Sequence, residues 1–268
     1  MHGFEVCKKI KEDAELKNTR ILISSSKSYA NDVATAKSAG ADNYLVKPYD
    51  VTSLIATVEE LIGGATIPLS LRFWGTRGSI PSPGPLTQRY GGNTPCTELR
   101  IGSTIIILDA GTGLRELGNS LMKEFQGKPI ESHIFIGHTH WDHIQGLPFF
   151  APAYVPQNRF TIYGVHGTTQ SFENILSGQM DPTYFPVGLK ELGSKPKIVE
   201  LSGATVLNDV KISYHYLNHP GITVGYRIET KNWIVSYISD HEPYGKLNNK
   251  GEFSVKEDDA VAQFILGS

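Results

Sequence analysis

The sequence predicts an α/β protein in two parts, and three features of the 268-residue chain indicate this class. Over residues 1–62, short apolar runs of strand character alternate with helical patterns. Residues 63–69 contain two glycines and a proline, the composition of a linker. From residue 70 onward, apolar segments separated by turn residues predict strands and a few helices. We therefore expect a first domain over residues 1–62 and a second over residues 70–268.

The composition excludes some function classes. Charged residues make up 19% of the chain and the formal net charge is -2, so the basic excess typical of nucleic-acid binders is missing. No apolar stretch approaches the roughly eighteen residues of a membrane span, and the N-terminus lacks the layout of a signal peptide. Cys7 and Cys96 form no CxxC pair and indicate a reducing compartment. We expect a cytoplasmic protein with no membrane and no evident nucleic-acid partner.

The first domain is expected to contain three helices and two strands. Helical spacing over residues 4–11 precedes a short apolar strand in RILISSS. A second helix is expected through Lys37, and a strand in DNYLV ends at Lys47-Pro48. Residues 50–62 have amphipathic spacing, with Leu54, Ile55, Val58, Leu61 and Ile62 expected to face inward. Helices that alternate with apolar strands imply a doubly wound parallel sheet covered on both faces.

The second domain is expected to begin with a strand in LRFWG and a loop dense in proline and glycine. TELRIG and STIIILDAG predict a hairpin, and the following helix has an inner stripe of Leu114, Leu117 and Leu121. A strand in RFTIYG and a helix over residues 168–176 come next. VKISYHYLN, GITVGYRIET and NWIVSYISD predict three more strands, and VKEDDAVAQFIL predicts an amphipathic helix.

Two segments are candidates for the walls of a binding site. Residues 178–197 are rich in glycine and proline and carry an aromatic pair, Tyr184 and Phe185. A loop of this length in a compact domain is often a substrate lid, and plain surface packing is equally consistent with it. The apolar, proline-broken segment LPFFAPAYVP is expected to form one wall of the pocket.

The motif HTHWDH gives the strongest functional signal. It follows an apolar strand that stops at Gly137, and it places His138, His140, Asp142 and His143 on the loop that leaves this strand. Such a spacing suits neither an amphipathic helix nor a strand that hides its polar residues. Imidazole nitrogens and a carboxylate favour zinc, manganese or iron over calcium. We interpret the motif as a metal site.

The segment GTGLRELG resembles a phosphate-binding loop only weakly, because it lacks the lysine and the spacing of a P-loop. A tight strand-to-helix turn is the favoured interpretation. Asp109, at the end of the preceding strand, would then cap the helix or support a metal ligand.

HTHWDH followed by IQGLPFF resembles the metallo-β-lactamase superfamily. Further similar segments are FWGTRGSIPSPGP, RYGGNTPC, LDAGTGLRELG, LNHPG and YISDHEPY, which are most like its phosphodiesterase and ribonuclease-Z-like branches. Together they cover nearly all of the chain after Leu71. The resemblance implies an αββα sandwich and a site for two divalent metal ions.

The same resemblance implies a set of ligands. One ion would be held by His138, His140 and His219. The second would be held by Asp142 and His143, and Asp240 would bridge the two ions. Such a pair lowers the pKa of a shared water and clamps a phosphoryl or acyl oxygen. Asp142 would orient the resulting hydroxide and accept its proton. Zinc is the favoured ion, with manganese and iron as alternatives.

Two features near the end of the chain differ from the ligand set that the resemblance implies, or leave a supporting role open. In the family, further strands and helices bring a last metal-binding histidine, and none follows here, so we expect a C-terminally incomplete domain and a second metal site short of one ligand. His215 lies four residues before His219 in a predicted strand and could support the site, although such a histidine is more often structural.

The first domain resembles the second half of a response-regulator receiver domain. ILISSS ends on the hydroxyl switch position at Ser25, and GADNYLVKP supplies the aromatic switch position at Tyr44 and the phosphoryl-pairing lysine at Lys47. Without this extended match, Lys47 would be an ordinary solvated lysine. The acidic pair and the phosphoryl-accepting aspartate of the family should precede Met1, so we expect a partial receiver unit. Its strand edge would be free to pair with another chain.

These observations predict a metal-dependent hydrolase, with a phosphodiesterase favoured, under receiver control in the intact protein of a bacterial two-component system. A small phosphodiester or ester is the expected substrate. A tRNA-processing nuclease is disfavoured by the net charge and by the lack of an evident RNA-binding arm. The alternative is an inactive fragment or a non-enzymatic metal-binding output module.

Overall fold

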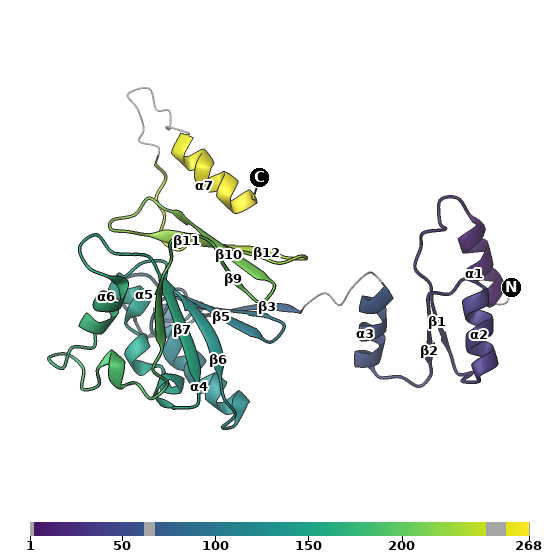
Figure 1. Ribbon diagram of the computed structural model, residues 1–268, viewed down its shortest axis with the longest axis horizontal. Coiled ribbons are helices and arrows are strands. Elements are labelled where there is room, and N and C mark those ends of the chain that lie inside the picture. The colour runs from purple at the N-terminus through teal and green to yellow at the C-terminus, as the bar shows by residue number, and fades with distance from the viewer. Residues whose placement is uncertain (1–2, 62–67, 245–255, 268) are drawn as a thin grey trace. The chain divides into compact units, whose positions relative to one another are not determined.

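The computed structural model describes residues 3–61, 68–244 and 256–267. The chain divides into two compact units, Met1–Ile67 and Pro68–Ser268, and each is described by itself (Figure 1). Most of the expected linker, residues 63–67, lies outside the described residues, and Leu69 already belongs to the first strand of the second unit. The boundaries expected at residues 62 and 70 remain a proposal.

The first unit is a small α/β layer. It contains α1 (Gly3–Glu12), β1 (Leu22–Ser25), α2 (Ala30–Ser38), β2 (Asn43–Val46) and α3 (Val51–Leu61). β1 and β2 pair in parallel, with Ser25 opposite Val46. Buried Cys7 and Ala36 bring α1 and α2 into one core with the sheet. The predicted order of helices and strands is therefore confirmed in the described part of this unit.

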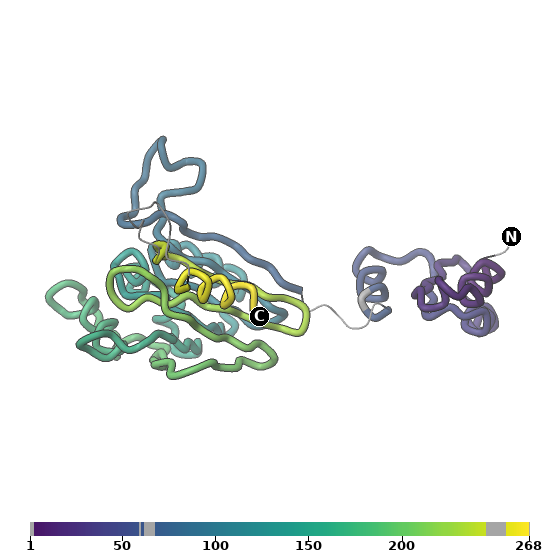
Figure 2. The backbone as a smooth tube through the Cα atoms, turned by 90° about the horizontal axis from the view of Figure 1, so that it is seen from above, coloured from purple at the N-terminus to yellow at the C-terminus, as the bar shows by residue number. Residues whose placement is uncertain are grey.

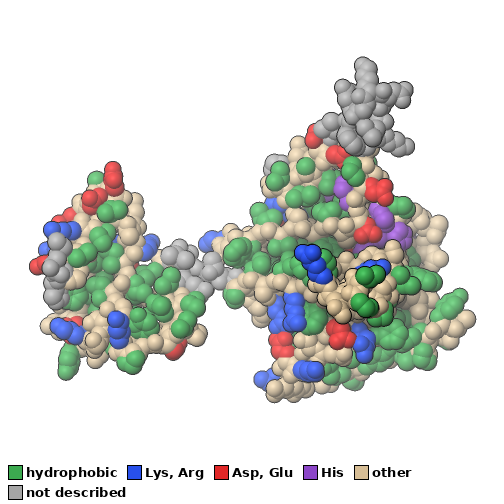
Figure 3. All heavy atoms as spheres, turned by 180° about the vertical axis from the view of Figure 1, so that it is seen from behind, with side chains coloured by type: hydrophobic (Ala, Val, Ile, Leu, Met, Phe, Trp, Pro, Cys, Tyr) green, Lys and Arg blue, Asp and Glu red, His purple; other side chains and the backbone are tan. Residues whose placement is uncertain are grey.

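The apolar stripe of α3 is only partly covered. Leu54 and Leu61 are half-buried, whereas Ile55 and Val58 are 51% and 39% exposed. The expectation that these two residues face inward is wrong, because a sheet of two strands is too narrow to cover the whole stripe. Ile62 lies outside the described residues. Apolar side chains are visible on the surface of this unit in Figure 3.

Asp42 ties the segments of the first unit together. Its carboxylate accepts hydrogen bonds from Lys11 Nζ at 2.9 Å, from Arg20 Nη1 at 3.0 Å and from the Ile21 N–H at 2.9 Å. The hydrogen bond from Lys11, followed by that from Ile21, lowers the pKa of Asp42 to about 2. The carboxylate therefore stabilises the fold in its charged form.

Replacing Asp42 with asparagine is expected to destabilise the first unit at neutral pH. A carboxyl group whose pKa is depressed by folding stabilises the protein above its unfolded value of 3.8, and this stabilisation is lost as the pH falls through about 2. Hydrogen exchange of the β1 and β2 amides should therefore show a difference from the parent protein that shrinks across this window. Glu12→Gln, at an exposed position, is the control. A difference that persists unchanged at pH 2 would contradict the charge argument.

The described residues of the second unit form two sheets. One has the order β3-β4-β5-β6-β7-β8, with the bounds Leu69–Gly75, Cys96–Ile101, Thr104–Leu108, Glu131–Phe135, Arg159–Gly164 and Lys197–Glu200. Its pairs are antiparallel from β3 to β5 and parallel from β5 to β8. The other has the order β12-β11-β10-β9 and is antiparallel, with β9 (Thr205–Leu207), β10 (Val210–Tyr216), β11 (Val224–Glu229) and β12 (Ile234–Tyr237).

The helices of this unit are α4 (Gly113–Phe125), α5 (Trp141–Ile144), α6 (Phe172–Gly178) and α7 (Lys256–Leu266). Short 3₁₀ turns are η1 (Pro85–Thr87), η2 (Leu147–Phe149), η3 (Ala151–Tyr154) and η4 (Leu189–Glu191). α6 begins four residues after the predicted start because Ser171 caps it, with its Oγ accepting the Asn174 N–H at 3.2 Å. Among the described helices, none is long and apolar enough to cross a membrane.

The elements of the second unit stack in four layers. The predicted leucine stripe of α4 is fully buried against one face of the six-stranded sheet. Between the sheets, Phe135 stacks on Tyr163 at 4.4 Å and meets the edge of Tyr226 at 5.3 Å. α7 lies along the outer face of the four-stranded sheet, where the Phe264 ring stacks on His215 (Figures 1 and 2). The predicted αββα sandwich is therefore confirmed.

Candidate metal centre

The histidine motif occupies the loop that leaves β6 and the short helix α5. Gly137 fixes this loop between the sheets, because its N–H donates to Asp109 Oδ1 at 2.7 Å and its carbonyl accepts the Val224 N–H at 2.9 Å. His138 and His140 extend from the loop, and α5 carries Asp142 and His143. The sequence thus forms a rigid turn in which four polar side chains follow a buried strand.

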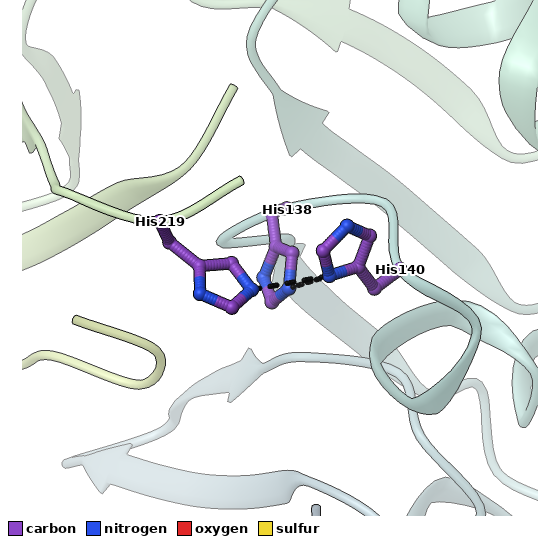
Figure 4. Close-up of side chains that lie close together, drawn as sticks. All are labelled: His138, His140 and His219. Atoms are coloured by element: carbon purple, nitrogen blue, oxygen red, sulfur yellow. Dashed lines mark hydrogen bonds between the residues drawn. The ribbon is translucent and has the colours of Figure 1, made fainter. Parts of the chain in front are cut away.

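The other two predicted ligands come from the second sheet. His219 follows β10 and Asp240 follows β12, so both lie at the ends of strands that pack over β6. Figure 4 shows the His219 ring pointing toward those of His138 and His140. In the space-filling view, histidine side chains gather beside acidic ones on this unit (Figure 3). The fold therefore brings together residues that are almost eighty or a hundred positions apart along the chain.

Three histidine nitrogens form the first group of donors. His138 Nε2 lies 3.0 Å from His140 Nδ1, which lies 3.2 Å from His219 Nε2. Ligand nitrogens in a tetrahedral zinc site, with Zn–N of 2.0–2.1 Å, are separated by about 3.3 Å. The spacing of the three imidazoles therefore fits a divalent ion.

A second group consists of His138, His143 and Asp240. Asp240 spans both groups, with Oδ1 3.6 Å from His143 Nε2 and Oδ2 3.5 Å from His219 Nε2. Asp142 Oδ2 lies 3.6 Å from His143 Nε2. Asp142 does not belong to either of the two groups of three donors. His143 Nε2 is buried and has no hydrogen-bond partner among the described residues. A buried nitrogen left unpaired between two carboxylates fits a bound cation.

Asp109 supports this centre from behind. It is completely buried, and its φ of 63° turns the chain at the end of β5. Its Oδ2 lies 2.7 Å from His143 Nδ1 and accepts a hydrogen bond from the Tyr237 hydroxyl at 2.7 Å. This arrangement leaves His143 Nε2 free for a metal ion and fixes the plane of the ring. Of the two roles expected for Asp109, capping of α4 is not observed, because Thr112 occupies the N-cap position, whereas Asp109 does contact His143, a proposed ligand.

Asp109→Asn is expected to weaken metal binding about 10- to 100-fold, because an asparagine amide in place of Oδ2 would face the donors of His143 and Tyr237. Competition of the protein with a chromogenic chelator measures the affinity. Tyr237→Phe removes only one hydrogen bond and should have a smaller effect. An unchanged affinity in Asp109→Asn, with an unchanged melting temperature, would show that the carboxylate does not act through His143.

The pKa values of the two buried histidines, His138 and His143, are shifted in opposite directions. Burial, and then the neighbouring His143, His140 and His219, lower the pKa of His138 to about 2. Burial also lowers the pKa of His143, but the hydrogen bond and charge of Asp109 outweigh it and raise the value overall. His138 is therefore neutral over the physiological range, which is the form in which imidazole binds metal ions.

The loop after β3 reaches the same site. Ser79, with a φ of 70°, donates its N–H to Asp142 Oδ2 at 2.7 Å. Gly78 and Ser79 line an open cavity of about 590 Å³ together with His140, Asp142, His219 and Asp240. No sequence pattern indicates this contact, because it is made by a backbone N–H group. A serine in the left-handed region is the structural sign of it.

His215, considered as a support for the site, does not reach it. Its ring stacks on Phe264 of α7 at 5.4 Å, so the structural interpretation of this residue holds.

Of the predicted switch positions of the first unit, Ser25 is the last residue of β1 and Lys47 directly follows β2, whereas Tyr44 is the second residue of β2. The Lys47 N–H donates to the Ser25 carbonyl at 2.8 Å, which places these two residues side by side. The Tyr44 hydroxyl donates to the Lys27 carbonyl at 2.9 Å. Lys47 is exposed. The assignment of switch roles to Ser25, Tyr44 and Lys47 remains a proposal.

Comparisons with known proteins agree with both resemblances. Residues 1–59 match the response regulator receiver domain family. The chain is 29% identical over 130 residues to ribonuclease Z of Methanococcus maripaludis and 30% over 131 residues to that of Pyrococcus horikoshii, in each case 47% of this chain and 39% of the relative. The chain thus spans about two fifths of the length of these relatives. It is also 34% identical over 62 residues to the response regulator ArlR of Staphylococcus aureus, covering 23% of this chain and 27% of that protein.

The chain is also similar to two solved structures at low sequence identity. The metallo-β-lactamase fold protein YhfI of Bacillus subtilis gives a TM-score of 0.42 at 18% identity, with 64% of this chain and 62% of that chain covered. The short form of human tRNase Z gives 0.44 at 18% identity, with 63% and 68% covered. The resemblances to receivers and to metallo-β-lactamase-fold hydrolases are confirmed. The expectation of no nucleic-acid partner is contradicted, because the relatives from Methanococcus maripaludis and Pyrococcus horikoshii are named ribonuclease Z.

Proposed function

We propose that this chain, in which a receiver segment precedes a domain of the metallo-β-lactamase fold, hydrolyses phosphodiesters with the help of two divalent metal ions. The observation that carries the proposal is the convergence of two donor groups that share His138. The ribonuclease Z relatives make RNA a candidate among the phosphodiesters.

The proposed ligands are those implied by the motif and its partners. His138, His140 and His219 would hold one ion, Asp142 and His143 the second, and Asp240 would lie between them. Bound divalent ions lower the pKa of water and polarise a phosphoryl oxygen. Zinc is the proposed ion because histidines outnumber carboxylates among the donors.

Asp142 is proposed to orient the attacking water and to accept its proton. Its side chain is 11% exposed, so one face is open to the cavity while the rest is held in place. The Ser79 N–H fixes Oδ2 in that position. Such a positioned carboxylate is suited to general-base catalysis.

The receiver segment is proposed to regulate this hydrolysis in the intact protein. The match of residues 1–59 to receivers supports this regulation, and it supports a cytoplasmic location. This regulation would operate in the intact signalling protein. Hydrolysis at the metal centre can be tested separately from the regulation.

The test combines metal analysis of the full chain with hydrolysis of bis-p-nitrophenyl phosphate and of a short RNA. We expect about two metal ions per chain, turnover that a chelator abolishes, and recovery when zinc is restored. His219→Ala should lower the metal content, whereas His166→Ala, at an exposed pair with Glu200, should not. Metal binding without any turnover would instead support a non-enzymatic metal-binding module. A protein that binds no metal would contradict both.

A further inference from the structure

A second cavity opens directly beside the metal centre. It has a volume of about 580 Å³, within the range of small-molecule sites. Thr139 and Trp141 line both this cavity and the one over the metal ligands. The two spaces are therefore adjacent, and a ligand bound at the metal centre can extend from one into the other. We call the second cavity the aromatic groove, defined by Trp141, Gln145, Phe149, Gln179, Tyr184 and Phe185.

The helix that carries two proposed ligands also builds the groove. Asp142 and His143 of α5 are directed to the metal centre, whereas Trp141, Ile144 and Gln145 line the groove. Residues three and four positions apart share one side of a helix, so the short helix has a metal side and a groove side. A group held in the groove is thereby fixed relative to Asp142 and His143.

The groove exposes aromatic rings that a folded domain would normally cover. Trp141 is 81% exposed, Tyr184 is 80% exposed and Phe149 is 56% exposed. Phe149 packs edge-on against Phe185 at 5.4 Å, which holds one wall in place. Exposed aromatic residues gathered at a cavity indicate binding of a flat or apolar group.

The polar atoms of the groove narrow the choice of ligand. Among the residues that the structure describes, its lining contains no charged side chain, but it contains two carboxamides, Gln145 and Gln179. Gln145 is engaged through its Nε2, which donates to Thr94 Oγ1 at 3.2 Å. Gln179 Nε2 is buried and has no hydrogen-bond partner among the described residues. Aromatic faces for stacking and a carboxamide for edge contacts are the chemistry by which proteins bind nucleobases.

We propose that the aromatic groove binds the nucleobase of a nucleotide whose phosphate lies at the metal centre. Trp141 and Tyr184 stack on the base, and Gln179 hydrogen-bonds its edge. This inference rests on the proposed phosphodiesterase function for the position of the phosphate. It adds that the groove next to this phosphate determines the specificity for the substrate.

The test compares binding of adenosine 5′-monophosphate with that of ribose 5-phosphate, which lacks the base, by calorimetry on the metal-loaded protein. We expect the base to tighten binding, and Trp141→Ala to weaken binding of adenosine monophosphate about 5- to 150-fold while leaving ribose 5-phosphate unchanged. Gln179→Ala should weaken only adenosine monophosphate. Trp233→Ala, at an exposed tryptophan on the β11–β12 turn, is the matched control and should change neither Kd.

Equal binding of the two ligands by the parent protein would overturn the inference, as would a Trp141→Ala variant that binds both as the parent does. Octyl phosphate is the probe for an apolar chain, and a dependence on Trp141 for this ligand alone would also overturn it. Discrimination by the base in a protein that does not hydrolyse phosphodiesters would contradict only the proposed function. Hydrolysis without discrimination would contradict only the groove assignment.

Discussion

Asp142→Asn is expected to lower kcat for phosphodiester hydrolysis about 100- to 10,000-fold, the usual effect of removing a general base. Asparagine has the same shape, so it can still accept the Ser79 N–H that now reaches Asp142 Oδ2 at 2.7 Å. It cannot accept a proton from water, and it carries no charge beside His143. The loss should therefore fall on kcat with little change in KM.

The measurement is steady-state kinetics at a zinc concentration that saturates the variant, with metal content determined on the same sample. This design separates the two roles proposed for Asp142. If saturating zinc restores kcat, Asp142 acts as a ligand and not as the base. Asp209→Asn, which alters an exposed carboxylate between β9 and β10, is the control and should leave kcat unchanged.

The ligands differ in how directly the sequence reveals them. Four of them lie within six residues of one another, and their pattern has no explanation as a helix or a strand. His219 and Asp240 are each a single polar residue at the end of a predicted strand, so only the family resemblance identified them. Which strand ends meet is decided by the order of the strands and by the stacking of the two sheets. A single sequence does not contain that order in any local pattern.

The supporting groups were harder to predict for a related reason. Asp109 carried a weak signal, an acidic residue at the end of a run of buried apolar residues. Tyr237 and the Ser79 amide carried none, because a tyrosine in a strand and a backbone N–H have ordinary roles in most places. Trp141 lies inside the histidine motif, but the sequence does not indicate a binding role for it. That role is suggested by the structure, in which its side chain is exposed beside the groove. The stripe of α3 shows the converse, because its spacing correctly predicted a helix, but Ile55 and Val58 are exposed in the described part of the first unit.

Gly146→Ala is expected to destabilise the second unit by about 1–3 kcal/mol or more and to reduce its metal content. A Cβ at this position would lie 1.9 Å from the carbonyl oxygen of Gly111, a backbone atom that cannot move aside alone. The two segments are joined by the Ala110 N–H donating to the His143 carbonyl and by the Gly146 N–H donating to the Ala110 carbonyl, both at 2.8 Å. Pushing them apart would shift His143 away from Asp109.

Gly111, the first glycine of the segment GTGLRELG, allows a similar close approach, which agrees with the tight strand-to-helix turn favoured for this segment. At Gly111, a Cβ would lie 2.2 Å from the carbonyl oxygen of Asp142, so the loop after β5 and helix α5 touch through their backbones. Thermal unfolding and metal analysis of Gly146→Ala test this contact, with Gly203→Ala as the control because a Cβ there meets no atom within 4 Å. If Gly146→Ala melted like the parent protein and kept its metal, the close approach would not be what holds His143 and Asp142 in place.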